Sequence, residues 1–191
     1  MKMQSYNLVL GSQSPRRKEL LEAAGFSFRV EVRSIDEIFD PKMDVYQVAE
    51  YLAVQKTLPF EDSLQEDEIL LTADSVVILD GEIFGKPNGV EGAKAMLKAL
   101  SGKKHTVVTG VALKNKDRLI SFSDQAQVYM DSLSDEEIDY YIEKCQPFDK
   151  AGSYGIQEWI GYCKINKIEG TFANIKGLPV NKVYHQLLKH F

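Results

Sequence analysis

Cysteine is scarce in this sequence, and no apolar run is long enough to cross a membrane. The two cysteines, Cys145 and Cys163, lie far apart and lack metal-ligand spacing. They therefore indicate free thiols in a reducing compartment rather than a disulfide framework. The first residues contain no apolar core of a signal peptide, so we expect a cytoplasmic protein with no membrane partner.

Histidine is also scarce, and there is no excess of positive charge. The three histidines, His105, His185 and His190, form no constellation in the sequence and indicate no catalytic role. The formal net charge is -5, which argues against a general nucleic-acid binder. An acidic chain that still clusters a few cations is better suited to a small polyanion, so no nucleic-acid partner is expected.

No repeat, low-complexity tract or Pro/Gly-rich linker divides the chain. Its 191 residues, 44% hydrophobic and 27% charged, can build a sizeable core. We expect a single domain over residues 1–191, or two closely packed lobes. Strand-like and helix-like segments alternate, which favours an α/β class. Near the end we expect a strand over residues 162–168, a loop over 170–175 and a helix opened by Pro179.

Residues 8–25 combine a short apolar strand, a polar turn and a helix. Ser14 is a natural N-cap, and Pro15 suits the first helical position. Arg16 and Arg17 then lie in the first turn, where the helix dipole disfavours cations unless an anion is close. A free helix N-terminus with two guanidinium groups favours a phosphate site. The alternative is that both arginines are solvated or pair with glutamates of the same helix.

Two charged residues interrupt apolar patterns further along. In the helix predicted over residues 45–58, Lys56 falls in the buried stripe, and its ammonium either snorkels from the helix end or points into a cavity. The strongest predicted strand, residues 69–79, is apolar except at Asp74 and Ser75. A buried carboxylate is costly unless it is paired or bound to metal. Asp74 is therefore either functional or brought to the surface by a bulge or bend.

Two other segments offer groups that could face a ligand. After the hairpin turn predicted at residues 80–81, Lys86 stands between a glycine and a proline. That placement suits a positioned cation, although a loop lysine is common. The segment 148–159 contains two glycines that allow close approach of the backbone, and Gln157 adds an amide. The alternative is a tight loop before a short helix.

Four motifs occur in order along the chain: S-x-S-P-R-R at residues 12–17, A-D-S-V-V at 73–77, G-K-P at 85–87 and D-K-A-G-x-Y-G-I-Q at 149–157. Together they closely resemble the Maf family of nucleoside triphosphate pyrophosphatases over nearly the whole chain. The Y-G-I-Q ending resembles the branch that acts on dTTP and UTP.

The resemblance implies an elongated α/β fold around a bent mixed β-sheet flanked by helices, with a cleft between two lobes. It also implies hydrolysis of a nucleoside triphosphate to the monophosphate and pyrophosphate. Such a reaction belongs to nucleotide metabolism and could remove modified pyrimidine nucleotides. The implied cofactor is a divalent metal, Mg²⁺ or Mn²⁺, and the implied assembly is a homodimer.

The resemblance also assigns roles to residues. Asp74 would be the proton acceptor for water or a metal ligand, and the sequence does not separate these two roles. Glu37 matches an acidic position of the family and is the second metal-ligand candidate, since hard oxygen ligands suit Mg²⁺ or Mn²⁺. The residues expected to bind the triphosphate are Ser12, Arg16, Arg17, Lys56 and Lys86, and those at base-selectivity positions are Arg16, Ser75 and Gln157.

One departure and two alternatives complete the sequence-based expectation. The family usually has threonine where this chain has Ser75, which bears on nucleotide preference rather than on activity. The chain could instead be a non-catalytic nucleotide-binding regulator of septum formation, which the presence of Asp74 disfavours. It could also be a pyrophosphatase for methylated GTP or another nucleotide, which Gln157 and Arg16 disfavour.

Overall fold

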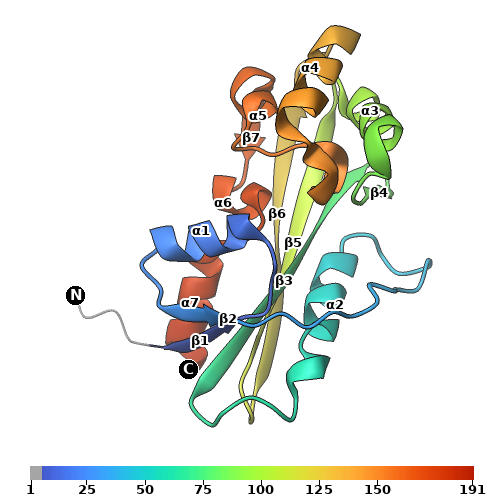
Figure 1. The fold of residues 1–191 in the computed structure, drawn as a ribbon. Helices are drawn as coiled ribbons and strands as arrows, with labels where there is room; N and C mark the ends of the chain where they lie inside the picture. The colour runs from blue at the N-terminus through green and yellow to red at the C-terminus, as the bar shows by residue number, and fades with distance from the viewer. Residues whose placement is uncertain (1–5) are drawn as a thin grey trace. The chain divides into compact units, whose positions relative to one another are not determined.

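A computed structural model describes residues 6–191 of the chain (Figure 1). These residues gather into two compact units. The first comprises the chain up to Asp74 together with Thr109–Asp124 and Gly177–Phe191, and the second comprises Ser75–Val108 and Gln125–Lys176. The single domain over residues 1–191 stays a prediction, as do the elongated shape and the cleft.

Within the described residues, the strands form one seven-stranded sheet of order β2-β1-β3-β5-β6-β7, with β4 paired to β3. Strand β1 pairs with β2 and β3 in parallel, whereas β4 and β7 pair antiparallel with β3 and β6. The α/β class and the mixed sheet are therefore confirmed. The strands are β1 (Asn7–Leu10), β2 (Phe28–Val30), β3 (Glu68–Leu79), β4 (Glu82–Phe84), β5 (Lys104–Lys114), β6 (Leu119–Met130) and β7 (Ile165–Glu169).

The helices alternate with these strands along the chain. None of the helices in residues 6–191 is long and apolar enough to cross a membrane. The α-helices are α1 (Pro15–Ala23), α2 (Val48–Gln55), α3 (Gly89–Leu100), α4 (Asp135–Cys145), α5 (Trp159–Cys163), α6 (Phe172–Lys176) and α7 (Val180–His190). The 3-10 turns are η1 (Leu58–Phe60), η2 (Pro147–Asp149) and η3 (Ala151–Ser153).

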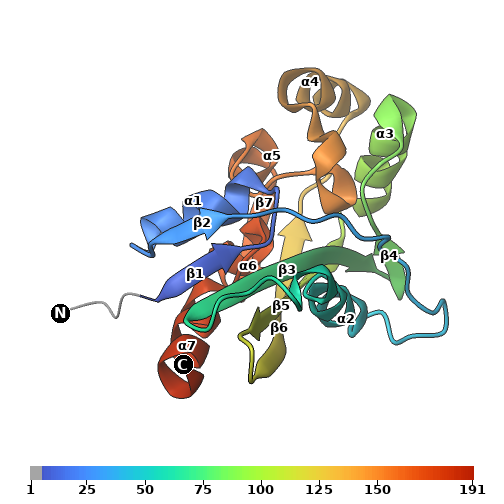
Figure 2. The same ribbon diagram turned by 60° about the horizontal axis from the view of Figure 1, so that its bottom comes forward.

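In the first unit, apolar side chains leave the parallel strands on both faces. Leu8 of β1 packs in one cluster with Leu21 of α1 and Leu187 of α7. Val9 points to the opposite face and packs against Phe60 of η1. Figures 1 and 2 show α1 lying over β1 and β2. This burial on both faces explains why β1 consists almost entirely of apolar residues.

The second unit has its own apolar core. Leu97 and Leu100 of α3 and Ile138 and Tyr141 of α4 are all buried in one cluster, together with Val128 of β6. A capping box formed by Ser134 and Glu137 starts α4, with both of its reciprocal hydrogen bonds present. The helices α3 and α4 therefore cover one side of this core, and the 3-10 turns η2 and η3 pack against α3.

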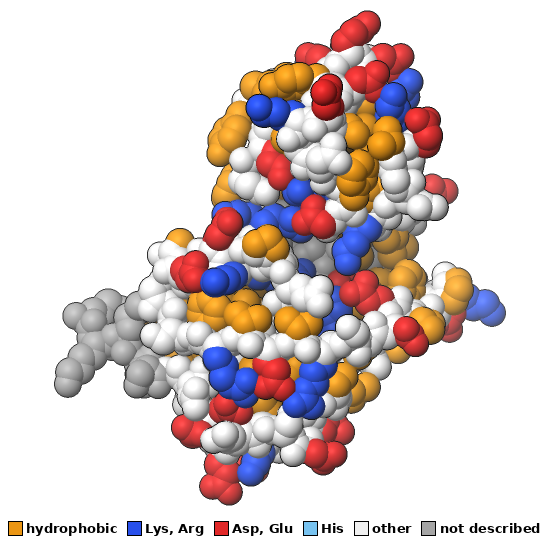
Figure 3. Space-filling view, viewed as in Figure 1, with side chains coloured by type: hydrophobic (Ala, Val, Ile, Leu, Met, Phe, Trp, Pro, Cys, Tyr) orange, Lys and Arg blue, Asp and Glu red, His pale blue; other side chains and the backbone are white. Residues whose placement is uncertain are grey.

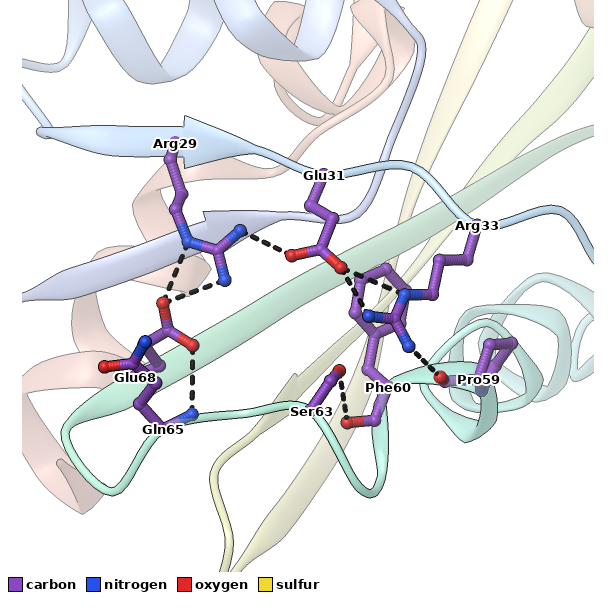
Figure 4. A network of polar contacts seen from close by, with 8 residues as sticks. All are labelled: Arg29, Glu31, Arg33, Pro59, Phe60, Ser63, Gln65 and Glu68. Carbon is purple, nitrogen blue, oxygen red and sulfur yellow. Dashed lines mark hydrogen bonds and ion pairs between the residues drawn. The ribbon is translucent and has the colours of Figure 1, made fainter.

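A network of charged side chains holds the edge strand β2 and the segment that follows it (Figure 4). Arg29 donates to Glu68 at 2.8 Å, and Glu31 accepts from both Arg29 and Arg33. Arg33 also stacks its guanidinium over Phe60, 4.7 Å from the ring centroid. Bonding to Arg29 lowers the pKa of Glu68 and of Glu31.

This network has two structural consequences. Charged side chains on a short edge strand discourage pairing with another chain. Arg33 also anchors the chain to the carbonyl oxygen of Pro59, shortly before the irregular segment that carries Glu37. The start of that segment is therefore fixed to the fold, although the segment itself contains no helix or strand.

The surface carries interspersed charges of both signs on the face drawn in Figure 3. A typical pair is Lys18 with Glu22, whose side chains are 55% and 54% exposed and lie 3.7 Å apart. Exposed pairs of this kind contribute about 0–1 kcal/mol each. Stability therefore comes chiefly from the two apolar cores.

Two expectations about elements near the C-terminus were wrong. Residues 159–163 are helical, so the strand predicted from 162 begins only at Ile165. Residues 172–176 form a helix instead of a loop, and the Thr171 hydroxyl accepts a bond from the backbone N–H of Asn174 at its start. Both helices span only five residues, too short for apolar periodicity to reveal them.

Candidate functional site

The turn between β1 and α1 places a hydroxyl and a guanidinium together. Arg17 donates from Nη1 to Ser12 Oγ at 3.0 Å and from Nε to the carbonyl oxygen of Gly177 at 2.9 Å. Ser12 is buried, and its oxygen also accepts from the backbone N–H of Ser14 at 3.3 Å. The alternative in which Arg17 is merely solvated is therefore wrong.

The electrostatics of this turn favour an anion. Burial lowers the pKa of Arg17 and the charge of Arg16 lowers it further, while the carboxylates of Asp74 and Glu37 oppose the shift. Two adjacent cations lie in the first turn of α1, where the helix dipole is unfavourable to them. A bound anion would relieve both the repulsion between the arginines and the dipole interaction.

A lysine between two carboxylates forms the second cluster of the first unit. Lys56 Nζ lies 2.6 Å from Asp74 Oδ1 and 2.8 Å from Glu37 Oε1. Its side chain is 16% exposed, so the snorkelling alternative is wrong. Asp74 is 9% exposed within the unbroken strand β3, so the bulge or bend to the surface is wrong as well.

Local structure explains how these residues meet. The buried Thr72 hydroxyl donates to the carbonyl oxygen of Ala53 at 2.7 Å, which fixes the last turn of α2 against β3. Thr72 and Asp74 are two residues apart on a strand, so their side chains share a face. Lys56 follows the end of α2, where a cation interacts favourably with the helix dipole. The Lys56 ammonium therefore reaches Asp74 on the face of β3 that packs against α2.

The donor set at Lys56 bears on the predicted metal. Among the described residues, no three or more His, Cys, Asp and Glu side chains gather in a metal-binding group. The carboxylates of Glu37 and Asp74 nevertheless converge on one cation, the Lys56 ammonium. Two hard oxygen donors suit Mg²⁺ or Mn²⁺, ions that commonly keep waters and substrate phosphates as their other ligands. The two residues fit such an ion, and the metal stays a prediction.

The remaining predicted site residues belong to the second unit. Ser75 is half-buried in β3, and Lys86 is exposed just after β4. Gln157 is half-buried between η3 and α5, and its Oε1 is buried with no hydrogen-bond partner among the described residues. The roles assigned to these residues stay predictions.

Sequence reasoning missed several residues that contact the predicted site residues within each unit. The carbonyl oxygen of Gly177 holds Arg17, and backbone acceptors leave no signal in a sequence. Glu158 directly follows the last motif and contacts Gln157, Lys150 and Tyr141. Lys150 lies inside that motif, so its charge among apolar and small residues could have indicated it. Tyr141 lies in the buried stripe of α4, which predicts only core packing.

A comparison with solved structures identifies the fold class of this chain. The solved structure of the Staphylococcus aureus Ham1 protein has a TM-score of 0.58 to this chain at 13% identity, covering 97% of this chain and 100% of that one. The likeness shows a shared α/β fold with an open mixed sheet.

The sequence then defines the family. The model of the family described as Maf-like protein matches residues 7–190, and the chain belongs to this family. A dTTP/UTP pyrophosphatase of Bacteroides thetaiotaomicron is 45% identical over 188 residues, 98% of this chain and 97% of its own length. One of Porphyromonas gingivalis is 47% identical over 190 residues, 97% and 94%, and one of Thermosipho africanus is 48% identical over 177 residues, 93% and 90%. The family inferred from the four motifs is therefore confirmed.

Proposed function

We propose that this chain hydrolyses dTTP and UTP to the nucleoside monophosphate and pyrophosphate. Full-length relatives at 45–47% identity carry the name of this activity. In the geometry, the proposal rests on Asp74, a carboxylate buried in a central strand and held by Lys56 in the same unit as Arg17. A protein that only binds nucleotides has no need of a carboxylate placed beside phosphate-binding cations.

The reaction needs a water molecule that attacks the α-phosphorus. The bond from this phosphorus to the oxygen bridging to the β-phosphate breaks, and pyrophosphate leaves with that oxygen. Asp74 accepts the proton that the water loses. Ser12, Arg16, Arg17, Lys56 and Lys86 bind the phosphates, and the four cations among them neutralise phosphate charge. Lys56 also keeps the Asp74 carboxylate in position.

Glu37 and Asp74 would hold the divalent cation. When bound, such an ion neutralises phosphate charge and makes a coordinated water more acidic. Because Lys56 contacts both carboxylates, it keeps them together when no ion is bound.

The homodimer also belongs to this proposal, and sedimentation velocity at micromolar concentration would test it.

Base choice follows from Gln157, Arg16 and Ser75. Uracil and thymine present an imide N–H between two carbonyl oxygens, and a side-chain amide can pair with the N–H and one carbonyl together. Sites built on such pairing discriminate strongly, because a wrong base leaves buried groups unpaired. The 5-methyl group of thymine changes apolar burial by about 1 kcal/mol at most, so dTTP and UTP should react at similar rates.

A pyrophosphate-release assay with Mg²⁺ tests the proposal on dTTP, UTP, CTP, ATP, GTP and a methylated GTP. We expect the highest kcat/KM for dTTP and UTP. Asp74→Asn should lower kcat by roughly 10²- to 10⁴-fold, while isothermal titration still detects nucleotide binding. Asp80→Asn is the matched control, because Asp80 is exposed in the β3–β4 turn.

Three outcomes would contradict the proposal. Wild-type protein without turnover on any nucleotide would indicate a binding protein. A preference for GTP or its methylated form over UTP would place the chain in another branch of the family. Near-normal turnover in Asp74→Asn, with Asp80→Asn unchanged, would remove Asp74 from catalysis.

A further inference from the structure

Glu158 is the centre of a hydrogen-bond network in the second unit. Its Oε2 accepts a short hydrogen bond from the Tyr141 hydroxyl. Its Oε1 accepts from Lys150 Nζ at 3.0 Å and from Gln157 Nε2 at 3.5 Å. Each of these three neighbours presents a donor to the carboxylate. Glu158 is thus fixed from two sides and offers Gln157 an acceptor.

Tyr141 and Lys150 are rigid supports for this carboxylate. Tyr141 is fully buried, and its oxygen accepts a bond from the backbone N–H of Gly155 at 2.9 Å. Burial, followed by the bond to Glu158, raises the pKa of Tyr141, so its hydroxyl remains a donor. Lys150 is 8% exposed and also pairs with Asp149 at 2.8 Å. The position of Glu158 is therefore set by the core of the unit.

Gly155 makes room for the pair formed by Gln157 and Glu158. A Cβ at this position would lie 2.8 Å from Gln157 Nε2 and 2.7 Å from Glu158 Cδ. Any side chain at Gly155 would therefore displace the amide or the carboxylate. The missing side chain lets both groups fold back over the backbone of the Y-G-I-Q segment.

The two ends of the Gln157 amide have different surroundings. Nε2 donates to Glu158, whereas the buried Oε1 has no hydrogen-bond partner among the described residues. A buried acceptor without a donor is costly, so this oxygen is suited to a donor that a ligand brings. An ionised carboxylate can only accept. Turning the amide over would point the Oε1 lone pairs at Glu158, which is repulsive.

We propose that Glu158 is a positioning residue that fixes the orientation of the Gln157 amide and thereby selects uracil and thymine against cytosine. The inference rests on the proposed function. With Oε1 turned toward the base, the amide oxygen accepts the imide N3–H, and the second Nε2 hydrogen can reach a neighbouring carbonyl of the base. Gln157 then matches the edge that uracil and thymine share.

The opposite amide orientation would match cytosine. Cytosine has a bare ring nitrogen at position 3, an acceptor, and an amine at position 4, a donor. A turned amide would donate to the ring nitrogen and accept from the amine. Because the two orientations differ only by exchange of oxygen and nitrogen, the shape of the pocket cannot separate them. A neighbouring group that can only accept hydrogen bonds does separate the two orientations, and Glu158 is such a neighbour of Gln157.

The test is the ratio of kcat/KM for UTP to kcat/KM for CTP. In Glu158→Gln, the new amide can donate as well as accept, so the orientation of Gln157 is no longer fixed. We expect the ratio to fall at least fivefold below the wild-type value. Glu158→Asp keeps an acceptor-only group and should retain the wild-type ratio even if both rates fall. Glu136→Gln, an exposed change on α4, controls for the loss of one charge.

A purely structural role for Glu158 would lower both rates together. A ratio in Glu158→Gln within fivefold of wild type would therefore overturn the inference while leaving the proposed function intact. Wild-type protein with no preference for UTP over CTP would overturn the inference together with the base choice of the proposed function, and wild-type protein with no turnover at all would overturn the proposed function.

If Glu158→Gln does not fold, the wild-type enzyme still gives a test with N3-methyl-UTP, which lacks the imide donor. We expect its kcat/KM to be at least tenfold below that of UTP. Equal values would overturn the inference.

Discussion

At the scale of single residues, His105 shows how burial sets pH dependence. Its Nε2 lies 2.7 Å from the Tyr154 hydroxyl, and the two rings meet edge to face at 5.4 Å. Burial lowers the pKa of His105 to about 4 from the ordinary 6.5. In the unfolded chain, His105 therefore gains a proton near pH 6.5. In the folded chain, it gains this proton only near pH 4.

This difference predicts a loss of stability on acidification. As pH falls from 7 to 5, the unfolded state gains the proton and the free energy of unfolding should decrease by about 2 kcal/mol. Urea denaturation at the two pH values measures it. His105→Gln cannot be protonated in this window, so its free energy of unfolding should change much less. An equal decrease in both proteins would assign the effect to other groups.

Single residues of the site could be predicted where they violate a pattern. Asp74 in an apolar strand, Lys56 in a buried helical stripe and Arg17 at a helix N-terminus all place charge where it is costly. The structure pairs each of them. Glu158 violates no pattern, because an acidic residue before a short helix is ordinary. Its importance comes from Tyr141, which reaches it across 17 positions of sequence.

At the scale of elements, α2 depends on a glycine of β5. A Cβ at Gly110 would lie 2.2 Å from the backbone nitrogen of Glu50 and 2.3 Å from the carbonyl carbon of Ala49. Because these are backbone atoms of α2, no side-chain rotation can relieve the clash. The helix therefore packs directly on the strand, and its end places Lys56 beside Asp74.

Gly110→Ala should displace α2. Overpacking of this kind costs about 1–3 kcal/mol, and kcat/KM should fall because Lys56 moves with the helix. Gly92→Ala is the matched control: the nearest atoms to its Cβ belong to Pro87 at 3.6 Å, and alanine inside α3 should stabilise by about 0.5–1 kcal/mol. Urea denaturation with a pyrophosphate-release assay measures both. Wild-type stability in Gly110→Ala would contradict the direct packing of α2.

Elements were predictable in proportion to their length and their end signals. The twelve-residue strand β3 and the capped helix α4 follow directly from apolar runs and a capping box. The five-residue helices α5 and α6 do not, since tertiary contacts rather than propensity stabilise so short a helix. Strand β2 is also short and covers Phe28–Val30 only.

At the scale of the whole molecule, alternation of strands and helices sufficed for the α/β class, and four motifs sufficed for the family. The strand order did not follow from either, because β3 lies between β1 and β5 through pairings distant in sequence.

The chain is acidic overall, with a net charge of -5, yet it holds Arg16 and Arg17 in one helical turn. Binding of a polyanion should therefore depend on these few local cations.

Ligand binding should stabilise the whole fold through those cations. Inorganic pyrophosphate at a hundredfold excess over its Kd should add about 2.7 kcal/mol, which raises the Tm of a chain this size by roughly 5–10 °C. Arg17→Ala should remove most of that rise and should also lower the Tm of the free protein, because the bonds to Ser12 and Gly177 are lost. Lys18→Ala is the matched control, since this exposed neighbour loses the same charge. Thermal unfolding with and without pyrophosphate measures all three proteins. A pyrophosphate-induced rise in Arg17→Ala equal to that in wild type would show that Arg17 stabilises the turn without binding phosphate.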